Sequence, residues 1–270
     1  MPLGLRPWTI VGLLAAGLGL IGVSREASAR QSAPGSLAVA AAADLQTVLP
    51  ELISRFRRDT GVAATVSFGS SGNFFAQIQN GAPFDVFLSA DIDYARRLIA
   101  SGHADASSLY EYATGRIVLW TRNDSGIDVR GGLSVLKDER VRRIAIANPE
   151  HAPYGRAAAA AIRAAKMDDA VRGKLVLGEN ISQAAQFVES GNATVGIIAL
   201  SHAVGPALRS SGTYFLIPST THPPIRQAAV VVSSSRNKAI AAQFLAYLRR
   251  PEVAQLLERS GFSAPLAAAR

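Results

Sequence analysis

Residues 37–72 read LAVAAAADLQTVLPELISRFRRDTGVAATVSFGSSG, and they contain the first repeating unit of the fold. Leu37 to Ala42 is a continuous run of small apolar residues, which is typical of a strand buried on both faces. Apolar residues then recur every three or four positions from Leu45 to Phe56, the spacing of an amphipathic helix. Pro50 interrupts that pattern, so it either kinks the helix or marks the start of its regular part.

Two more strand–helix units follow. Gly61 ends the first helix, and alternation from Val62 to Phe68 predicts the second strand. A third strand is predicted at 85–89, with helices at 74–79 and 94–99. This β-α-β-α-β-α order predicts a parallel sheet with helices on its faces.

The rest of the chain also contains predicted strands and helices. Strands are predicted at 116–120, 143–147, 175–177, 195–199 and 227–233, and helices at 157–165, 182–189, 239–248 and 251–259. We therefore expect an α/β protein with a two-lobe fold, parallel-type sheets flanked by helices, and a ligand cleft between the lobes. Residues 36–116 and 217–270 are assigned to lobe I, and residues 117–216 to lobe II.

Composition narrows the function. Apolar residues make up 49% of the 270 residues and charged residues 18%, enough apolar material for a sizeable core. The formal charge is +8, but basic residues are dispersed and form no basic-aromatic stripe, so we expect a solvated basic surface and no nucleic-acid partner. The absence of cysteine excludes disulfides, thiolate metal sites and a cysteine nucleophile.

The N-terminal segment has the pattern of an export signal. Arg6 precedes an apolar run from Trp8 to Val23, and Ala27-Ser28-Ala29 follows as a small-x-small cleavage site. We expect residues 1–29 to be a signal peptide cleaved near Ala29, which implies a periplasmic protein. An uncleaved membrane anchor is the alternative.

Four short segments are suited to binding an anion. They are Ala43-Asp44, Ser70-Ser71, Pro153-Tyr154-Gly155 and Asn180-Ile181-Ser182, and each follows a predicted strand and opens a predicted helix. Ligands of parallel α/β sheets bind beyond the carboxyl ends of the strands, and helix starts offer free N–H groups and a positive dipole end. Each segment alone is an ordinary helix cap. The four together predict an anion pocket.

The chain from about Leu37 to Phe262 resembles the periplasmic molybdate-binding proteins of ABC transporters. The resemblance is carried by AAADLQ (41–46), FGSSG (68–72), QIQNGAPFDVFLSAD (77–91), GRIVLW (115–120), ANPEHAPYG (147–155) and residues 248–262. It implies a two-lobe periplasmic-binding fold that closes on its anion.

The resemblance also implies the site. The family's ligand-binding positions fall on Asp44, Ser71, Tyr154, Ile181 and Ala199, with loop support from Ala43, Ser70, Gly72, Pro153, Gly155 and Asn180. A molybdate or tungstate oxyanion is expected at Ser71, Tyr154 and Ile181, and no cofactor besides that ligand. Ala199 matches a position where some members use a tyrosine hydroxyl, and the Tyr154 phenol is expected to compensate for its loss.

Asp44 departs from the family, which often has serine or asparagine there. A carboxylate donates no hydrogen bond unless it is protonated. One interpretation is that Asp44 turns away and caps its helix through the N–H of Gln46 or Thr47. The other is that Asp44 accepts a proton from a ligand such as hydrogen phosphate or arsenate.

The sequence thus predicts an extracytoplasmic solute-binding protein that delivers molybdate or tungstate to an ABC importer. Its expected partner is the permease in the cytoplasmic membrane, and nothing calls for more than a monomer. A different oxyanion such as phosphate, arsenate or sulfate is the alternative ligand. An enzyme is not expected: Ser71 could be imagined as a hydrolase nucleophile, but its surroundings do not fit the nucleophile-elbow pattern.

Overall fold

The computed structural model describes residues 35–266. The predicted signal peptide lies outside these residues. Within them, no helix has both the length and the apolar character needed to cross a membrane.

The first sheet has five strands in the order β2-β1-β3-β10-β4. Its strands are β1 (Ser36–Ala42), β2 (Ala63–Gly69), β3 (Val86–Ser89), β4 (Tyr110–Gly115) and β10 (Ile225–Val231). Its helices are α1 (Leu49–Thr60), α2 (Ser71–Gln79), α3 (Ile92–Ala100), α8 (Lys238–Leu248) and α9 (Pro251–Arg259), with 3-10 turns η1 (Ala43–Thr47) and η2 (Ala106–Ser108).

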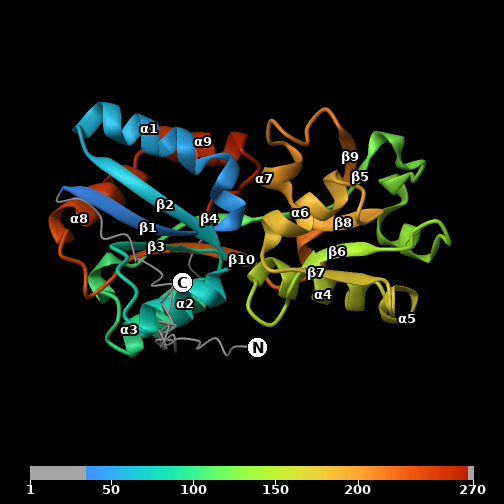
Figure 1. Cartoon of the computed structure of the whole chain (residues 1–270), viewed down its shortest axis with the longest axis horizontal. Coiled ribbons are helices and arrows are strands. Elements are labelled where there is room, and N and C mark those ends of the chain that lie inside the picture. Colours follow the sequence, from blue (N-terminus) through green and yellow to red (C-terminus); the bar gives the residue numbers. More distant parts are fainter. Residues whose placement is uncertain (1–34, 267–270) are drawn as a thin grey trace, which may run out of the picture. The chain divides into compact units, whose positions relative to one another are not determined.

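Helices cover both faces of this sheet (Figure 1). Leu37, Val39 and Ala41 of β1 pack with α1, α8 and α9, whereas Ala40 packs with α2 and α3. Successive side chains of a strand point to opposite faces of the sheet. Because helices bury both faces here, the strand is apolar at every position, which explains the continuous apolar run in the sequence.

The second sheet has the order β7-β6-β8-β5-β9. Its strands are β5 (Ile117–Arg122), β6 (Ile144–Ala147), β7 (Leu175–Gly178), β8 (Val195–Ala199) and β9 (Gly212–Leu216). Its helices are α4 (Pro153–Ala164), α5 (Asp168–Val171), α6 (Ile181–Glu189) and α7 (Leu200–Ala203), with 3-10 turns η3 (Asn123–Ser125), η4 (Val129–Lys137) and η5 (Ser219–Thr221). One apolar cluster joins this sheet to its helices. Both sheets belong to one compact unit, and the lobe boundaries stay a prediction.

The α/β fold class is confirmed, but both sheets are mixed rather than wholly parallel. β10 runs antiparallel to β3 and β4, and β5 runs antiparallel to β8 and β9. The antiparallel direction of β5 follows from where the chain passes from the first sheet to the second. β4 ends at the carboxyl edge of the first sheet, and only Arg116 separates it from β5, which starts opposite Ala199 at the carboxyl edge of the second sheet. A strand that starts at this edge must run against its neighbours.

Local differences from the sequence prediction have local causes. Pro50 occupies the first turn of α1, where proline fits, so it marks the start of the helix and does not kink it. α2 begins at Ser71 rather than at residue 74 because the Ser70 side chain caps it. β4 and β9 were not predicted.

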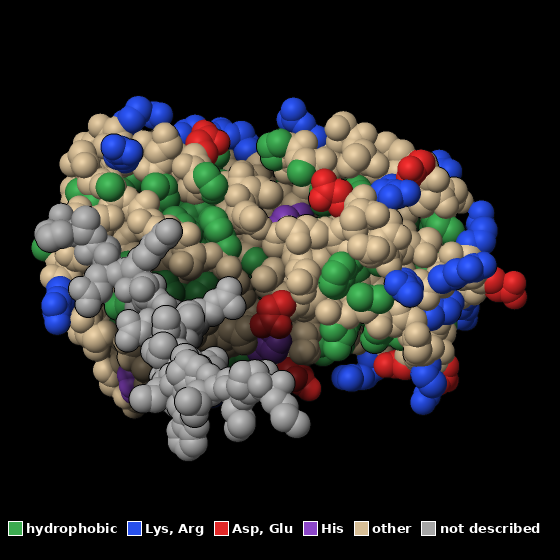
Figure 2. Space-filling view, viewed as in Figure 1, with side chains coloured by type: hydrophobic (Ala, Val, Ile, Leu, Met, Phe, Trp, Pro, Cys, Tyr) green, Lys and Arg blue, Asp and Glu red, His purple; other side chains and the backbone are tan. Residues whose placement is uncertain are grey.

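Basic side chains are spread over the face seen in Figure 2 and do not form one stripe. Several basic side chains pair with nearby carboxylates, as in Arg130–Asp128 and Arg140–Asp138. Such exposed pairs contribute little to stability.

Candidate functional site

A small cavity lies where the carboxyl edges of the two sheets meet. Its volume is about 10 Å³, about the space that one water molecule needs, so this conformation excludes a sugar or a peptide. Its walls come from both sheets and their helices, and they consist of Ala42, Ala43, Asp44, Gly69, Ser70, Ser71, Ala90, Ala152, Pro153, Tyr154, Asn180 and Ile181. No lysine or arginine is part of this lining.

Three helices point their N-termini at the cavity. α2 begins at Ser71, α4 at Pro153 and α6 at Ile181. Among the described residues, the backbone N–H groups of Ser71, Tyr154 and Ile181 have no hydrogen-bond acceptor outside their helices, and their first-turn positions deny them one inside. The cavity therefore presents three peptide donors, each at the positive end of a helix dipole.

The capping residues explain why these N–H groups stay free. The Asn180 side chain accepts hydrogen bonds from the N–H groups of Ser182 and Gln183 at 3.0 and 3.1 Å. The Ser70 hydroxyl accepts one from the Asn73 N–H at 3.3 Å. Caps satisfy the second and third N–H groups of a helix and leave the first one available. α4 instead begins with proline, which has no N–H of its own.

Ser71 contributes its side chain as well. Its Oγ accepts a hydrogen bond from the Ala90 N–H at 2.9 Å, and the residue is 1% exposed. Because the hydroxyl accepts in that bond, its own hydrogen remains available for donation. Ser71 therefore offers two donors to the cavity, one from the backbone and one from the side chain.

Asp44 does not cap its helix, so that prediction is wrong. Its Oδ2 accepts hydrogen bonds from the Tyr154 hydroxyl at 2.8 Å and from Gln227 Nε2 at 2.5 Å. Tyr112 donates to Gln227 Oε1 at 2.8 Å, which turns the amide nitrogen toward Asp44. The carboxylate points toward Tyr154 and Gln227 because these buried donors need an acceptor.

This network also changes the expected role of the Tyr154 phenol. Its hydroxyl donates to Asp44, so only its backbone N–H is left as a donor toward the cavity. Gln227 Nε2 lies 3.2 Å from the same hydroxyl, so Asp44, Tyr154 and Gln227 all contact one another. The phenol therefore does not supply the tyrosine donor that Ala199 lacks.

Burial dominates the electrostatics of Asp44. Removal of the carboxylate from water raises its pKa from 3.8 to about 6, although the hydrogen bonds from Tyr154 and Gln227, and the backbone N–H groups of Asp44 and Leu45, lower it in part. Burial, together with the nearby Asp44 charge, raises the pKa of Tyr154 and of Tyr112 well above 10.0. Both phenols therefore stay protonated and remain donors. Asp44 Oδ1 is buried and has no hydrogen-bond partner among the described residues.

Direct contacts bridge the two sides of the cavity. The Gly72 N–H donates to the His151 carbonyl at 2.9 Å, and His151 Nδ1 lies 2.9 Å from Ser70 Oγ. A Cβ at Gly72 would lie 2.6 Å from that carbonyl oxygen, so only glycine permits the approach.

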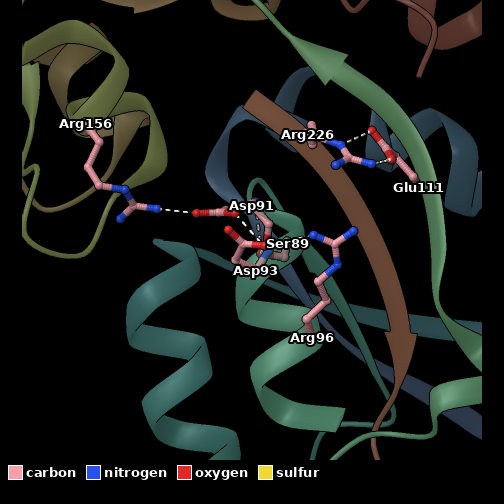
Figure 3. A network of polar contacts seen from close by, with 7 residues as sticks. All are labelled: Ser89, Asp91, Asp93, Arg96, Glu111, Arg156 and Arg226. Atoms are coloured by element: carbon pink, nitrogen blue, oxygen red, sulfur yellow. Dashed lines mark hydrogen bonds and ion pairs between the residues drawn. The ribbon is translucent and has the colours of Figure 1, made fainter. Parts of the chain in front are cut away.

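A salt bridge lies beside these contacts. Figure 3 shows Arg156 of α4 reaching Asp91, the residue that caps α3. The same guanidinium donates to the Tyr94 hydroxyl at 3.2 Å. The pair therefore ties a helix of the second sheet to a helix of the first.

The structure brings most of the predicted residues together. Eight of them line the cavity: Ala43, Asp44, Ser70, Ser71, Pro153, Tyr154, Asn180 and Ile181. Three do not. Gly72 and Gly155 follow the lining residues in their helices, and Ala199 is 0% exposed with its methyl group in the core of the second sheet.

Some residues of the site were missed. Ala90 follows β3 and would have been found by extending the rule on strand ends to the third strand. Gln227 is the first residue of a predicted strand, and a single amide at the start of an apolar run is a signal for a buried polar partner. Gly69, Ala42 and Ala152 carry no such signal.

Nothing in the site resembles a hydrolase. Ser71 has no histidine partner within the described part of the chain, since His151 contacts Ser70 instead. The described residues also contain no group of three or more His, Cys, Asp or Glu placed to hold a metal ion.

The chain is similar to known solute-binding proteins. The family model for bacterial extracellular solute-binding proteins matches residues 37–263. The molybdate-binding protein ModA of Azotobacter vinelandii is 36% identical over 250 residues, covering 93% of this chain and 96% of that protein. The ModA of Rhodobacter capsulatus is 36% identical over 231 residues, covering 86% and 89%.

A solved structure agrees. The periplasmic molybdate-binding protein of Azotobacter vinelandii superposes with a TM-score of 0.80 at 34% identity, covering 85% of this chain and 100% of that one. These relatives are named as molybdate-binding proteins, and the matching family model is one of solute-binding proteins. The chain, with its two mixed sheets and its cavity of helix N-termini, belongs to the bacterial extracellular solute-binding proteins.

Proposed function

We propose that this protein captures molybdate or tungstate outside the cytoplasm and delivers the ion to an ABC importer. The observation that carries the proposal is the convergence of three free helix-start N–H groups, those of Ser71, Tyr154 and Ile181, on one small cavity. Neutral dipoles that surround an oxyanion spread its charge, so no lysine or arginine is required. The likeness to the molybdate-binding proteins supports the choice of ion.

The site residues of this proposal follow from the geometry. The backbone N–H groups of Ser71, Tyr154 and Ile181 donate to anion oxygens, and the Ser71 hydroxyl adds a fourth hydrogen bond. These groups contact the oxygens of the ion and not its metal centre. Signal-peptide cleavage near Ala29 and docking onto a membrane permease belong to the same proposal, on the strength of the N-terminal pattern and of the family.

A second candidate ligand is favoured by Asp44. A carboxylate on the cavity wall accepts a hydrogen bond from an anion that carries its own proton, such as hydrogen phosphate or hydrogen arsenate. Sulfate carries no proton at neutral pH and gains nothing from this group.

Calorimetric titration with molybdate, tungstate, sulfate and phosphate tests the proposal. We expect molybdate and tungstate to bind alike and more tightly than sulfate. A melting scan provides an independent check, because a ligand that binds only the folded state stabilises it by about 2.7 kcal/mol at 100 times its Kd. Tm should then rise on the order of 5–10 °C. Phosphate displacing molybdate near neutral pH would replace the first candidate by the second.

A further inference from the structure

The wall of the cavity holds one acidic side chain that the capture of a dianion leaves unexplained. Asp44 is 0% exposed and lines the cavity together with the donors of Ser71, Tyr154 and Ile181. Its Oδ1 has no partner within the described residues, and no cationic side chain belongs to the cavity wall. A dianion and an ionised carboxylate would therefore share a small space without a counter-charge.

We propose that Asp44 makes anion capture proton-coupled, so that the cavity takes up one proton together with each tetrahedral dianion and holds that proton on Asp44. The inference rests on the proposed function and adds to it the stoichiometry and pH dependence of binding. The bound anion brings two negative charges and the proton one positive charge, so the net charge of the protein falls by one per ion captured.

The geometry assigns the proton to one oxygen. Oδ2 already accepts two hydrogen bonds, from the Tyr154 hydroxyl at 2.8 Å and from Gln227 Nε2 at 2.5 Å. A proton on Oδ2 would compete with both donors, whereas Oδ1 has no hydrogen-bond partner among the described residues. A protonated Oδ1 converts the acid from a repelling charge into one more hydrogen-bond donor for the anion.

Protonation of Asp44 costs less binding affinity than repulsion between its charge and the anion. Two like charges about 4 Å apart at a protein-like dielectric constant weaken association by about a thousandfold for each unit of anion charge. The pKa of Asp44 is raised by burial to about 6. Protonation at neutral pH therefore costs only about tenfold in affinity. Uptake of a proton is the less costly way to accommodate a dianion.

Neighbouring groups do not compete for this proton. Tyr154 of α4 and Tyr112 of β4 face the carboxylate, and both have pKa values well above 10.0. His202 of α7, which packs on η1, has a pKa lowered by burial to about 4. α6 presents Ile181 and Ser182, which do not titrate, and no charged side chain contributes to the pKa shift of Asp44.

The test is calorimetric titration of the whole protein with molybdate at about pH 7.5, in buffers that differ in ionisation enthalpy. We expect the apparent enthalpy to follow the buffer with a slope near one proton taken up per ion. Affinity should fall about tenfold per pH unit above pH 6.5. Asp44→Asn keeps the acceptor for Tyr154 and Gln227 and places an N–H₂ where the acid hydrogen would lie, so it should bind molybdate with no proton uptake and no pH slope.

Controls separate the possible outcomes. Asp128→Asn removes an exposed carboxylate paired with Arg130 and should behave as the wild type. Hydrogen phosphate brings its own proton, so any binding of it should show uptake near zero. Wild-type binding that is independent of buffer and pH overturns the inference and leaves the proposed function standing. No binding of molybdate or tungstate from pH 5.5 to 8.5 overturns the proposed function instead.

A spectroscopic measurement keeps the inference testable if Asp44→Asn fails to fold. A difference infrared spectrum of the wild type should gain a carboxylic-acid C=O band when molybdate is added at about pH 7.5. Absence of that band at saturation contradicts the proposal.

Discussion

Tyr154 donates its hydroxyl to Asp44 Oδ2 over 2.8 Å, and this buried bond joins α4 of the second sheet to η1 of the first. The two residues are 110 positions apart. Both also line the cavity, so the same pair takes part in holding the two sides together and in forming the binding site. Polar bonds that are this deeply buried are costly to break, since an unpaired partner remains.

Ser71→Ala should weaken molybdate binding by about 1–3 kcal/mol. The change removes the side-chain donor to the anion, a charge-assisted bond, while the backbone N–H remains. It also leaves the Ala90 N–H without its acceptor, so the free energy of unfolding should fall as well. Calorimetry and urea unfolding measure the two effects separately. Ser134→Ala, at an exposed serine, is the control. Unchanged affinity would show that Ser71 does not touch the ligand.

Gly72→Ala should weaken binding by about 1–3 kcal/mol through overpacking. The added Cβ would lie 2.6 Å from the His151 carbonyl oxygen and 2.8 Å from the Tyr94 hydroxyl, so the two sides of the cavity could not approach as closely. Gly131→Ala provides a matched comparison, because its nearest neighbour would be a side-chain oxygen at 3.5 Å. Equal affinities for the two variants would rule out a role for this contact.

Arg156→Gln should lower affinity only a few-fold. The salt bridge with Asp91 spans the two sides, but its side chains are 39% and 26% exposed, so solvent screens it. Such pairs contribute about 0.2–1 kcal/mol. High salt should lower the affinity of the wild type to that of the variant, whose own affinity should not change through loss of this pair. Arg130→Gln serves as the control, because it removes the exposed salt bridge with Asp128, two residues away. A loss of a hundredfold or more would mean that Arg156 acts on the ligand directly.

Stability should depend on pH through two buried groups that oppose each other. Asp44 has a pKa raised to about 6 from 3.8, so its contribution is fully present below pH 3.8 and is lost as pH rises through 6. His202 has a pKa lowered to about 4 from 6.5, so its contribution is present above pH 6.5 and is lost as pH falls through 4. Each amounts to about 3 kcal/mol. The two nearly cancel in the wild type.

Single variants should reveal each contribution. In Asp44→Asn, the free energy of unfolding should fall by about 3 kcal/mol between pH 6.5 and 4, because only His202 remains. In His202→Leu, it should rise by a similar amount between pH 6 and 4. Urea unfolding across this range measures both. Identical pH profiles for the two variants would contradict the assignment of these groups.

The sequence by itself determined the elements and the donor set of the site. Apolar periodicity predicted most strands and helices, because burial of a strand face or a helix stripe is a local pattern. The segments around Ser71, Pro153 and Ile181 carry caps or a proline, so free N–H groups could be predicted there before any packing was known, although the predicted helices began one to four residues too late.

Only the tertiary structure decided what Asp44 does. A cap was the natural local expectation, but Gln227, 183 positions away, and Tyr154 provide the donors that turn the carboxylate inward. The strand directions of β5 and β10 and the burial of Ala199 were also decided by packing. The physical reason is the same in each case: hydrogen bonds and burial between distant segments leave no periodic trace in the chain, whereas capping and amphipathicity do.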